Sequence, residues 1–97
     1  MKLDFTPSAE EEFVEAVEYI YQENPKAALV FHQKAGKILQ RLKQFPESGR
    51  YLPEFPGLPY REVIVSPYRF FYRLSGNTVW VVALWHFSQD VKQPTDD

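Results

Sequence analysis

The sequence contains no cysteine. This absence excludes disulfides, thiolate zinc sites, iron–sulfur clusters and a cysteine nucleophile. No apolar run approaches the roughly 18 residues that a membrane-spanning helix needs. Residues 1–5 already include an acidic residue, and they lack the apolar segment that is typical of a signal peptide. We therefore expect a soluble, cytoplasmic protein that does not enter the membrane.

The common nucleotide-binding and catalytic motifs are also missing. The sequence has no G-x-x-x-x-G-K phosphate loop, no G-x-G-x-x-G, no G-x-S-x-G and no H-E-x-x-H. Its two histidines, His32 and His86, do not supply a zinc site, which needs three or four ligands. We predict neither a metal nor a cofactor.

What is present is typical of a small globular domain. Of the 97 residues, 44% are apolar, 25% charged and 16% aromatic, and this composition rules out disorder for the body of the chain. A chain of this length forms one domain. We predict a single domain over residues 1–88 and a polar, flexible tail over residues 89–97.

Charge is distributed unevenly along the chain. Residues 1–25 carry one lysine and seven acids, a net of −6, whereas residues 26–73 carry nine bases and three acids, a net of +6. Residues 74–97 add −2, which gives the overall net charge of −2. Such segregation favours a dipolar surface with a binding face, although the ordinary charged faces of exposed helices explain it equally well.

Local patterns predict strands and helices in a definite order. Alternation over residues 2–6 predicts a strand, and the dipeptides Thr6-Pro7 and Asn24-Pro25 are each typical of a helix start. The first helix is expected to end near Glu23 and the second at Phe45-Pro46. A proline-rich loop then spans residues 46–59, and three strands are predicted over residues 60–66, 68–74 and 78–86.

The resulting fold class is α+β, in the order β-α-α-β-β-β, with a helical hairpin packed on a mainly antiparallel four-stranded sheet. The first strand joins the sheet at its edge or at its centre. Gly36, in the middle of the second helix, is expected to allow a close approach of the helices. Gly76 and Asn77 are expected to tolerate positive φ in the last turn.

The strands carry the candidate functional residues. Arg69 and Arg73 alternate with large aromatic residues, so the aromatic set is expected to face the helices and the arginines the open face of the sheet. Arg61 begins the neighbouring strand and His86 ends the last one. Guanidinium groups bind phosphate and a neutral histidine moves protons near pH 7, so together these residues could cleave a phosphodiester without a metal.

A structural role for the same residues is the alternative, and the spacing alone favours it. The arginines would then pair with Glu47, Glu54 or Glu62, and His86 would be a satisfied residue at a strand end. The tyrosines around the loop and the sheet are expected to be core or interface residues rather than rings that stack on bases. These tyrosines are Tyr51, Tyr60, Tyr68 and Tyr72.

Six segments carry a resemblance to a known family. They are Phe5-Thr6-Pro7-Ser8-Ala9-Glu10-Glu11, Asn24-Pro25-Lys26-Ala27-Ala28, Phe45-Pro46-Glu47-Ser48-Gly49-Arg50, Tyr60-Arg61-Glu62, Pro67-Tyr68-Arg69-Phe70-Phe71-Tyr72 and the apolar strand that ends in His86. In this order and spacing, which cover nearly the whole chain, the sequence resembles the RelE/ParE superfamily of toxins from bacterial type II toxin–antitoxin systems. The order of elements derived above agrees with that resemblance.

The resemblance implies two different mechanisms. RelE-like members cut mRNA on the ribosome, and Arg69 and His86 fall where such nucleases keep catalytic residues, with Arg61 or Arg73 assisting. However, Phe87 follows His86 where these nucleases often have tyrosine, and a pI of about 5.7 is low for an RNA-binding protein. ParE-like members poison DNA gyrase without a catalytic centre, and segments 45–50 and 60–62 resemble them more closely. We therefore predict a ParE-like inhibitor of DNA gyrase.

A protein that binds its antitoxin without retained toxicity is the third possibility. In all three cases the resemblance implies a small cognate antitoxin that wraps the toxin as helix or strand, and for the toxic members it implies a role in growth inhibition and plasmid stabilisation. An exposed binding surface would leave more apolar area than a monomer tolerates. The chain is therefore expected to form a homodimer or a toxin–antitoxin hetero-oligomer.

Overall fold

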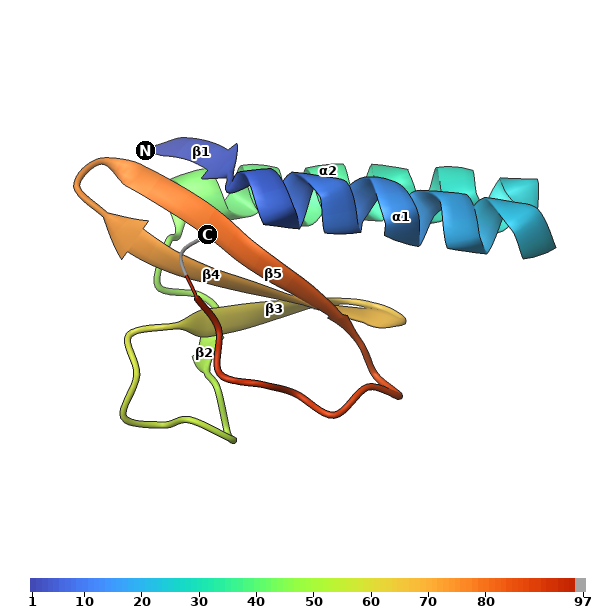
Figure 1. Cartoon of the computed structure of the whole chain (residues 1–97). Helices are drawn as coiled ribbons and strands as arrows, with labels where there is room; N and C mark the ends of the chain where they lie inside the picture. The colour runs from blue at the N-terminus through green and yellow to red at the C-terminus, as the bar shows by residue number, and fades with distance from the viewer. Residues whose placement is uncertain (96–97) are drawn as a thin grey trace.

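The computed structural model describes residues 1–95. Within this range the elements are β1 (Lys2–Phe5), α1 (Pro7–Glu23), α2 (Pro25–Gln44), β2 (Arg50–Tyr51), β3 (Arg61–Val65), β4 (Tyr68–Ser75) and β5 (Thr78–His86). Figure 1 shows the two helices side by side against the sheet. The predicted α+β class and the helical hairpin packed on a mainly antiparallel sheet are confirmed.

Both helices begin where their capping residues predict. The Thr6 side chain accepts a hydrogen bond from the N–H of Ala9 at 3.3 Å, and Asn24 Oδ1 accepts from the N–H groups of Lys26 and Ala27 at 3.1 and 3.2 Å. These bonds satisfy amide groups that a helix leaves without partners in its first turn. Because Asn24 alone separates α1 from α2, the two helices run antiparallel.

The sheet has the strand order β1-β5-β4-β3-β2. β1 lies at one edge, parallel to β5, and the other pairs are antiparallel. The prediction of four strands was one strand short, because Arg50 and Tyr51 pair with Glu62 and Arg61 as β2. A two-residue strand inside a proline-rich loop has no periodicity from which it could be recognised.

The sheet is covered on both faces. Tyr68, Phe70 and Tyr72 pack with the apolar stripes of α1 and α2, as predicted. On the opposite face, a second apolar cluster contains Leu52, Tyr60, Phe71, Val82 and Ala83, with Phe55, Leu58, Trp80, Trp85 and Val91 packed against it. The prediction that this face is open is therefore wrong. The loop between β2 and β3 carries apolar side chains and folds back over the sheet.

A β-bulge adjusts the pairing of β4 with β5. Phe71 pairs with Ala83 and Tyr72 with Val81, which leaves Val82 as the extra residue. Val82 and Ala83 both belong to the second apolar cluster, whereas Val81 belongs to the helix-facing core. The bulge therefore directs two consecutive side chains of β5 to the loop-covered face.

The structure corrects the prediction for Gly36, and of the two residues expected to tolerate positive φ it gives positive φ to Gly76 alone. A Cβ atom built on Gly36 would meet nothing within 4 Å, so this glycine is not required for helix contact. In the turn between β4 and β5, Gly76 has φ of +59°, but no non-glycine residue among residues 1–95 has positive φ, Asn77 included. The turn therefore needs only one left-handed residue.

The segment that follows β5 turns back toward the sheet (Figure 1). The N–H of Gln89 donates to the carbonyl of His86 at 3.0 Å, Val91 packs against the second apolar cluster, and Pro94 is buried. The last two residues of the predicted tail, 96–97, lie outside the described residues. Within residues 1–95, neither helix is both long and apolar enough to cross a membrane.

Candidate functional site

Arg69 of β4 is held between two carboxylates on the loop-covered face. Its Nε donates to Glu62 Oε1 at 2.6 Å, and its two terminal nitrogens donate to the two oxygens of Glu54 at 2.7 and 2.8 Å. The guanidinium carbon also lies 5.0 Å from the centroid of the Phe71 ring. This bidentate geometry is the strongest that a guanidinium forms with a carboxylate.

Glu62 is shared between two arginines. Its side chain has no exposed surface and accepts from Arg50 Nε and from Arg69 Nε, each at 2.6 Å. The Arg50 side chain is 64% exposed, whereas that of Arg69 is 12% exposed. Two arginines therefore compensate the buried negative charge of Glu62, and of these Arg69 is the one largely shielded from water.

The pKa values of the partners follow from this pairing. The hydrogen bonds from Arg69 are the main cause that lowers the pKa of Glu54 to about 2. The hydrogen bond to Glu54 is likewise the main cause that raises the pKa of Arg69 above its usual value. Arg69 thus stays charged, with its charge already neutralised by two acids. A group in this state is a poor ligand for a phosphate, because a phosphate would have to displace a carboxylate.

Arg61 binds the loop before β2. Its Nη1 donates to the carbonyl oxygens of Glu47 and Gly49 at 3.2 and 2.9 Å, and its Nη2 donates to the Tyr51 hydroxyl at 3.2 Å. The guanidinium carbon lies 4.1 Å from the Tyr51 ring centroid, a cation–π contact. These contacts tie the loop to the start of β3.

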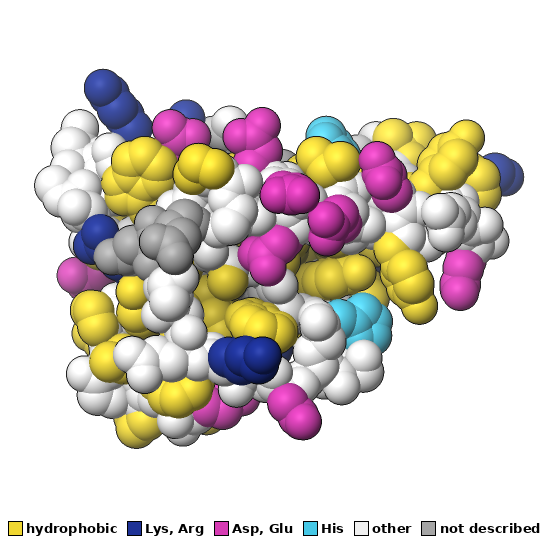
Figure 2. All heavy atoms as spheres, in the orientation of Figure 1, with side chains coloured by type: hydrophobic (Ala, Val, Ile, Leu, Met, Phe, Trp, Pro, Cys, Tyr) yellow, Lys and Arg dark blue, Asp and Glu magenta, His cyan; other side chains and the backbone are white. Residues whose placement is uncertain are grey.

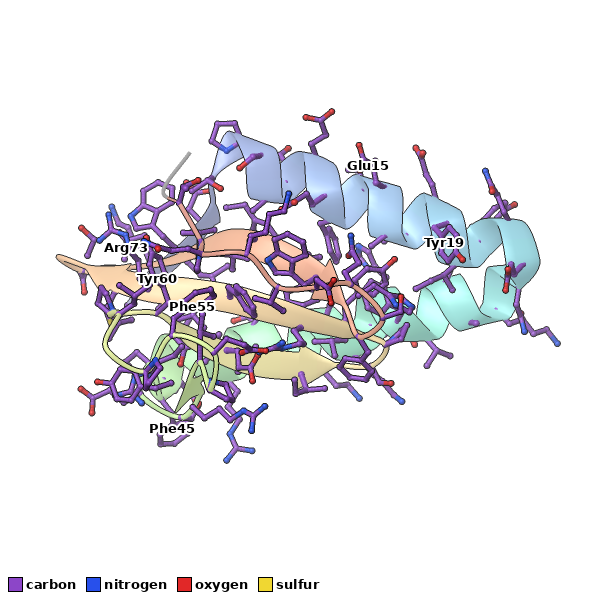
Figure 3. All side chains as sticks on the ribbon, turned by 60° about the horizontal axis from the view of Figure 1, so that its bottom comes forward. Glu15, Tyr19, Phe45, Phe55, Tyr60 and Arg73 are labelled. Carbon is purple, nitrogen blue, oxygen red and sulfur yellow. The ribbon has the colours of Figure 1, made fainter. Side chains whose placement is uncertain are left out.

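Arg73 lies farther along β4, on the same face of the strand as Arg69. It pairs across the strands with Trp80 and lines a hollow of about 360 Å³ together with Thr6, Pro7, Trp80 and Val82. Figure 3 shows Arg73 near Tyr60 and Phe55, the side chains of the loop that covers this face.

His86 lies on the other face of the sheet. Tyr68 pairs with His86 and Arg69 with Trp85, so the two candidate residues project to opposite sides. The His86 ring packs edge-on against Tyr68, with ring centroids 5.2 Å apart, and its Nδ1 lies 2.8 Å from Ser88 Oγ. The structure therefore does not bring Arg69 and His86 together into one site.

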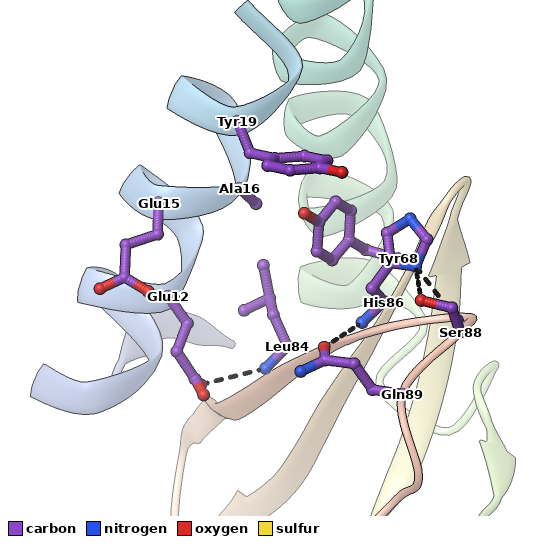
Figure 4. Close-up of a pocket in the computed structure, with 9 residues that line it drawn as sticks. All are labelled: Glu12, Glu15, Ala16, Tyr19, Tyr68, Leu84, His86, Ser88 and Gln89. Atoms are coloured by element: carbon purple, nitrogen blue, oxygen red, sulfur yellow. Dashed lines mark hydrogen bonds between the residues drawn. The ribbon is translucent and has the colours of Figure 1, made fainter. Parts of the chain in front are cut away.

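His86 instead lines a cleft of about 390 Å³ between α1 and the end of β5 (Figure 4). The residues that line this cleft are Glu12, Glu15, Ala16, Tyr19, Tyr68, Leu84, His86, Ser88 and Gln89. We call it the α1–β5 cleft. Figure 2 shows that acidic side chains gather along α1, so the cleft opens onto the acidic part of the surface.

Among residues 1–95, no three His, Asp or Glu side chains are placed to hold a metal ion. The described surface includes an acidic, aromatic cleft, the α1–β5 cleft.

Comparison with known proteins identifies the family. The family model described as "ParE toxin of type II toxin-antitoxin system, parDE" matches residues 3–91. The chain belongs to the ParE toxin family. No curated protein sequence matches this ParE-family toxin.

The fold of this ParE-family toxin is also found among solved structures. It is similar to a structure described as "Chromosomal ParDE TA system from P. aeruginosa", with a TM-score of 0.71 and 19% sequence identity. The alignment covers 89% of this chain and 95% of that chain. At this identity, the likeness concerns the fold.

Sequence reasoning named Glu54 and Glu62 as alternative partners of the arginines, and both form these pairs with Arg69. It did not recognise the α1–β5 cleft of this ParE-family toxin. A usable signal was present, because positions 12, 15, 16 and 19 fall on one face of a helix. That spacing predicts a common surface for Glu12, Glu15 and Tyr19, although not which strand completes it.

Proposed function

We propose that this ParE-family toxin arrests bacterial growth in the cytoplasm by inhibiting DNA gyrase, and that a cognate antitoxin neutralises it. Family membership supports a role as a toxin, and the proposal adds DNA gyrase as the target and a cognate antitoxin as the partner. It does not include cleavage of RNA.

The separation of Arg69 from His86 is the observation that carries the proposal. A metal-independent nuclease needs a proton-transfer group and a cation on the same phosphodiester. Here the two candidates lie on opposite faces of the sheet, and Arg69 is neutralised by Glu54 and Glu62. The arrangement supports a toxin that acts by binding its target.

The outer edge of β3 supports an antitoxin that binds as an added strand. β2 pairs only with Arg61 and Glu62, so within residues 1–95 no strand lies against the outer side of residues 63–65. An adjacent hollow of about 470 Å³ between α2 and β3 is lined by Arg41, Arg50 and Ile64, among others. An extended segment with apolar and acidic residues suits this edge, because strand addition supplies main-chain hydrogen bonds and the hollow supplies side-chain contacts.

Inducible expression in a bacterial host tests the target. DNA and protein synthesis are followed separately by incorporation of labelled precursors, and we expect DNA synthesis to fall first. Purified gyrase should lose supercoiling activity when the purified toxin is added. His86→Ala and Arg69→Lys should retain these effects, provided that urea unfolding shows the variants to be folded.

Two outcomes would replace this proposal. If protein synthesis falls first and mRNA is cut within codons, the toxin is a ribosome-dependent nuclease, and His86→Ala should then abolish the effect. If growth continues while the antitoxin still binds, the chain is an antitoxin-binding protein without toxicity.

Antitoxin binding is tested at the edge of β3. Ile64 is 43% exposed, and Ile64→Lys should weaken capture of the antitoxin without reducing toxicity. Val14→Lys, at a similarly exposed position of α1, is the matched control and should bind normally. Equal binding by both variants would exclude the edge of β3 as the docking site.

A further inference from the structure

The α1–β5 cleft has one acidic wall. Glu12 Oε1 accepts a hydrogen bond from the N–H of Leu84 at 3.2 Å, which fixes the carboxylate at the side of the cleft and leaves its other oxygen available. Glu15 follows one helical turn later on the same wall. Burial is the main cause that raises the pKa of Glu12, and the neighbouring Glu15 and Glu11 raise it further. The wall thus holds negative charge that lacks a positive partner among these contacts.

The second wall is aromatic. Tyr68 is 9% exposed, and burial raises the pKa of its hydroxyl. Within residues 1–95 this hydroxyl has no hydrogen-bond partner, and Figure 4 shows it directed toward Tyr19 and Ala16, into the cleft. Because the hydroxyl oxygen is not fully buried, it is accessible from the cleft and can accept a hydrogen bond from a bound donor.

Tyr19 completes the cleft with an open ring. Its side chain is 57% exposed, and in Figure 4 its ring lies above the Tyr68 hydroxyl. An exposed aromatic face next to carboxylates attracts a cation that is planar enough to stack on it. The cleft of about 390 Å³ has the size of a small-ligand pocket.

We propose that the α1–β5 cleft receives the guanidinium group of an arginine side chain from a partner protein. In this arrangement the guanidinium donates to Glu12, to Glu15 and to the Tyr68 hydroxyl, and it stacks on the Tyr19 ring. A metal ion does not suit the cleft, since no three acidic or histidine side chains among residues 1–95 converge on one point.

Arginine suits the cleft better than lysine does. A guanidinium presents five N–H donors in a plane, so it can bind acceptors on two walls while stacking on a ring. The compact ammonium group of lysine has three donors and does not stack. The chemistry of the cleft therefore selects the shape of the cation as well as its charge.

Titration of the full chain with N-acetyl-arginine-methylamide tests the proposal by nuclear magnetic resonance. We expect saturable shifts at the amides of Leu84, Ser88 and Gln89. N-acetyl-citrulline-methylamide, which has the same shape without the charge, should give none, and the lysine analogue should bind more weakly. Because the probe involves neither antitoxin nor gyrase, the result is independent of the proposed function.

Substitutions in α1 and β4 identify the side chains that bind the arginine probe. Glu15→Gln should weaken binding of the arginine probe about tenfold, as expected for loss of a charge-assisted hydrogen bond. Tyr68→Phe, which removes only the hydroxyl, should also weaken it. Glu18→Gln is the matched control, since Glu18 is an exposed acid of the same helix outside the cleft, and it should bind normally.

Three results would overturn the proposal. The citrulline probe could bind as tightly as the arginine probe, which would exclude recognition of charge. Glu18→Gln could weaken binding as much as Glu15→Gln, which would indicate attraction to the whole acidic helix. The same amides could shift with protein concentration alone, which would identify the occupant as a second copy of this chain.

Discussion

Arg69 Nε donates to Glu62 Oε1 at 2.6 Å, and Glu62 has no exposed side-chain surface. The two residues lie on neighbouring strands under the loop that covers the sheet. A buried carboxylate is strongly destabilising without a cation. The ion pair with Glu62 therefore gives Arg69 a structural role, which explains an arginine at this position without any catalytic role.

Arg69→Ala should reduce the free energy of unfolding by about 3 kcal/mol, because it leaves the buried charge of Glu62 with a single, exposed partner. Arg50→Ala should cost less than about 1 kcal/mol, since the Arg50 side chain is 64% exposed. Urea unfolding of both variants measures the difference. Equal losses would contradict a protected pair between Arg69 and Glu62.

The Glu54 carboxylate should make stability depend on pH in the acidic range. Its folded-state pKa of about 2 lies below the ordinary value of 4.5, so its contribution is complete above pH 4.5 and is lost as the pH falls toward 2. The Glu54 side chain is 39% exposed, and solvent screening limits this contribution to about 1 kcal/mol.

Glu54→Gln should therefore be less stable than the unmodified chain at pH 7, and most of this difference should be lost at pH 2, where about half of the Glu54 carboxyls are protonated. Thermal unfolding of both proteins across this range gives the comparison. A difference that persists unchanged at pH 2 would show that the effect does not come from the charge of Glu54.

Gly49→Ala should destabilise the fold by about 2 kcal/mol through overpacking. A Cβ at this position would lie 2.5 Å from the Tyr72 hydroxyl oxygen and 2.6 Å from the Glu62 carbonyl oxygen. It would also disturb the bond that the Gly49 N–H donates to the Tyr72 hydroxyl at 2.9 Å. Ser48→Ala, at the exposed neighbouring position, is the control for urea unfolding and should change stability little.

Gly36→Ala should stabilise the protein by about 1 kcal/mol, because alanine favours the helix and its Cβ meets nothing within 4 Å. Gly76→Ala gives the opposite expectation, since Gly76 has φ of +59°, which strains other residues. Thermal unfolding should show a rise for the first variant and a fall for the second. Loss of stability in Gly36→Ala would indicate a contact that the helix packing does not contain.

Glu12→Gln should raise the stability of the free protein at pH 7 by roughly 0.3 kcal/mol, because the cost of burying the charge is removed and repulsion from Glu15 is relieved. The amide oxygen of glutamine can still accept from Leu84. Because the folded-state pKa of Glu12 lies above the ordinary value of 4.5, ionised Glu12 opposes folding.

This effect has a defined pH dependence. The cost of Glu12 is absent well below pH 4.5, where the carboxyl is protonated in both states, and it grows as the pH rises through the folded-state pKa. Denaturant unfolding at pH 3 and pH 7 should show a gain for Glu12→Gln only at pH 7. A loss at pH 7 would mean that the negative charge supports the fold.

The sequence by itself determined the elements and most of their order. Thr6-Pro7 and Asn24-Pro25 specify helix starts through local hydrogen bonds and the fixed φ of proline. Alternation along β4 separated the aromatic residues of the core from Arg69 and Arg73. These features depend on neighbours in the chain, so they can be recognised without knowledge of the fold.

Only the tertiary structure decided which residues act together. The loop between β2 and β3 covers the face that holds Arg69, so Glu54 reaches it across 15 positions of sequence. The pairing of β4 with β5 sends Arg69 and His86 to opposite faces, and Glu12 meets Leu84 across 72 positions. Such contacts arise from the packing of distant segments, and nothing in the local sequence encodes which of several possible partners is brought within reach.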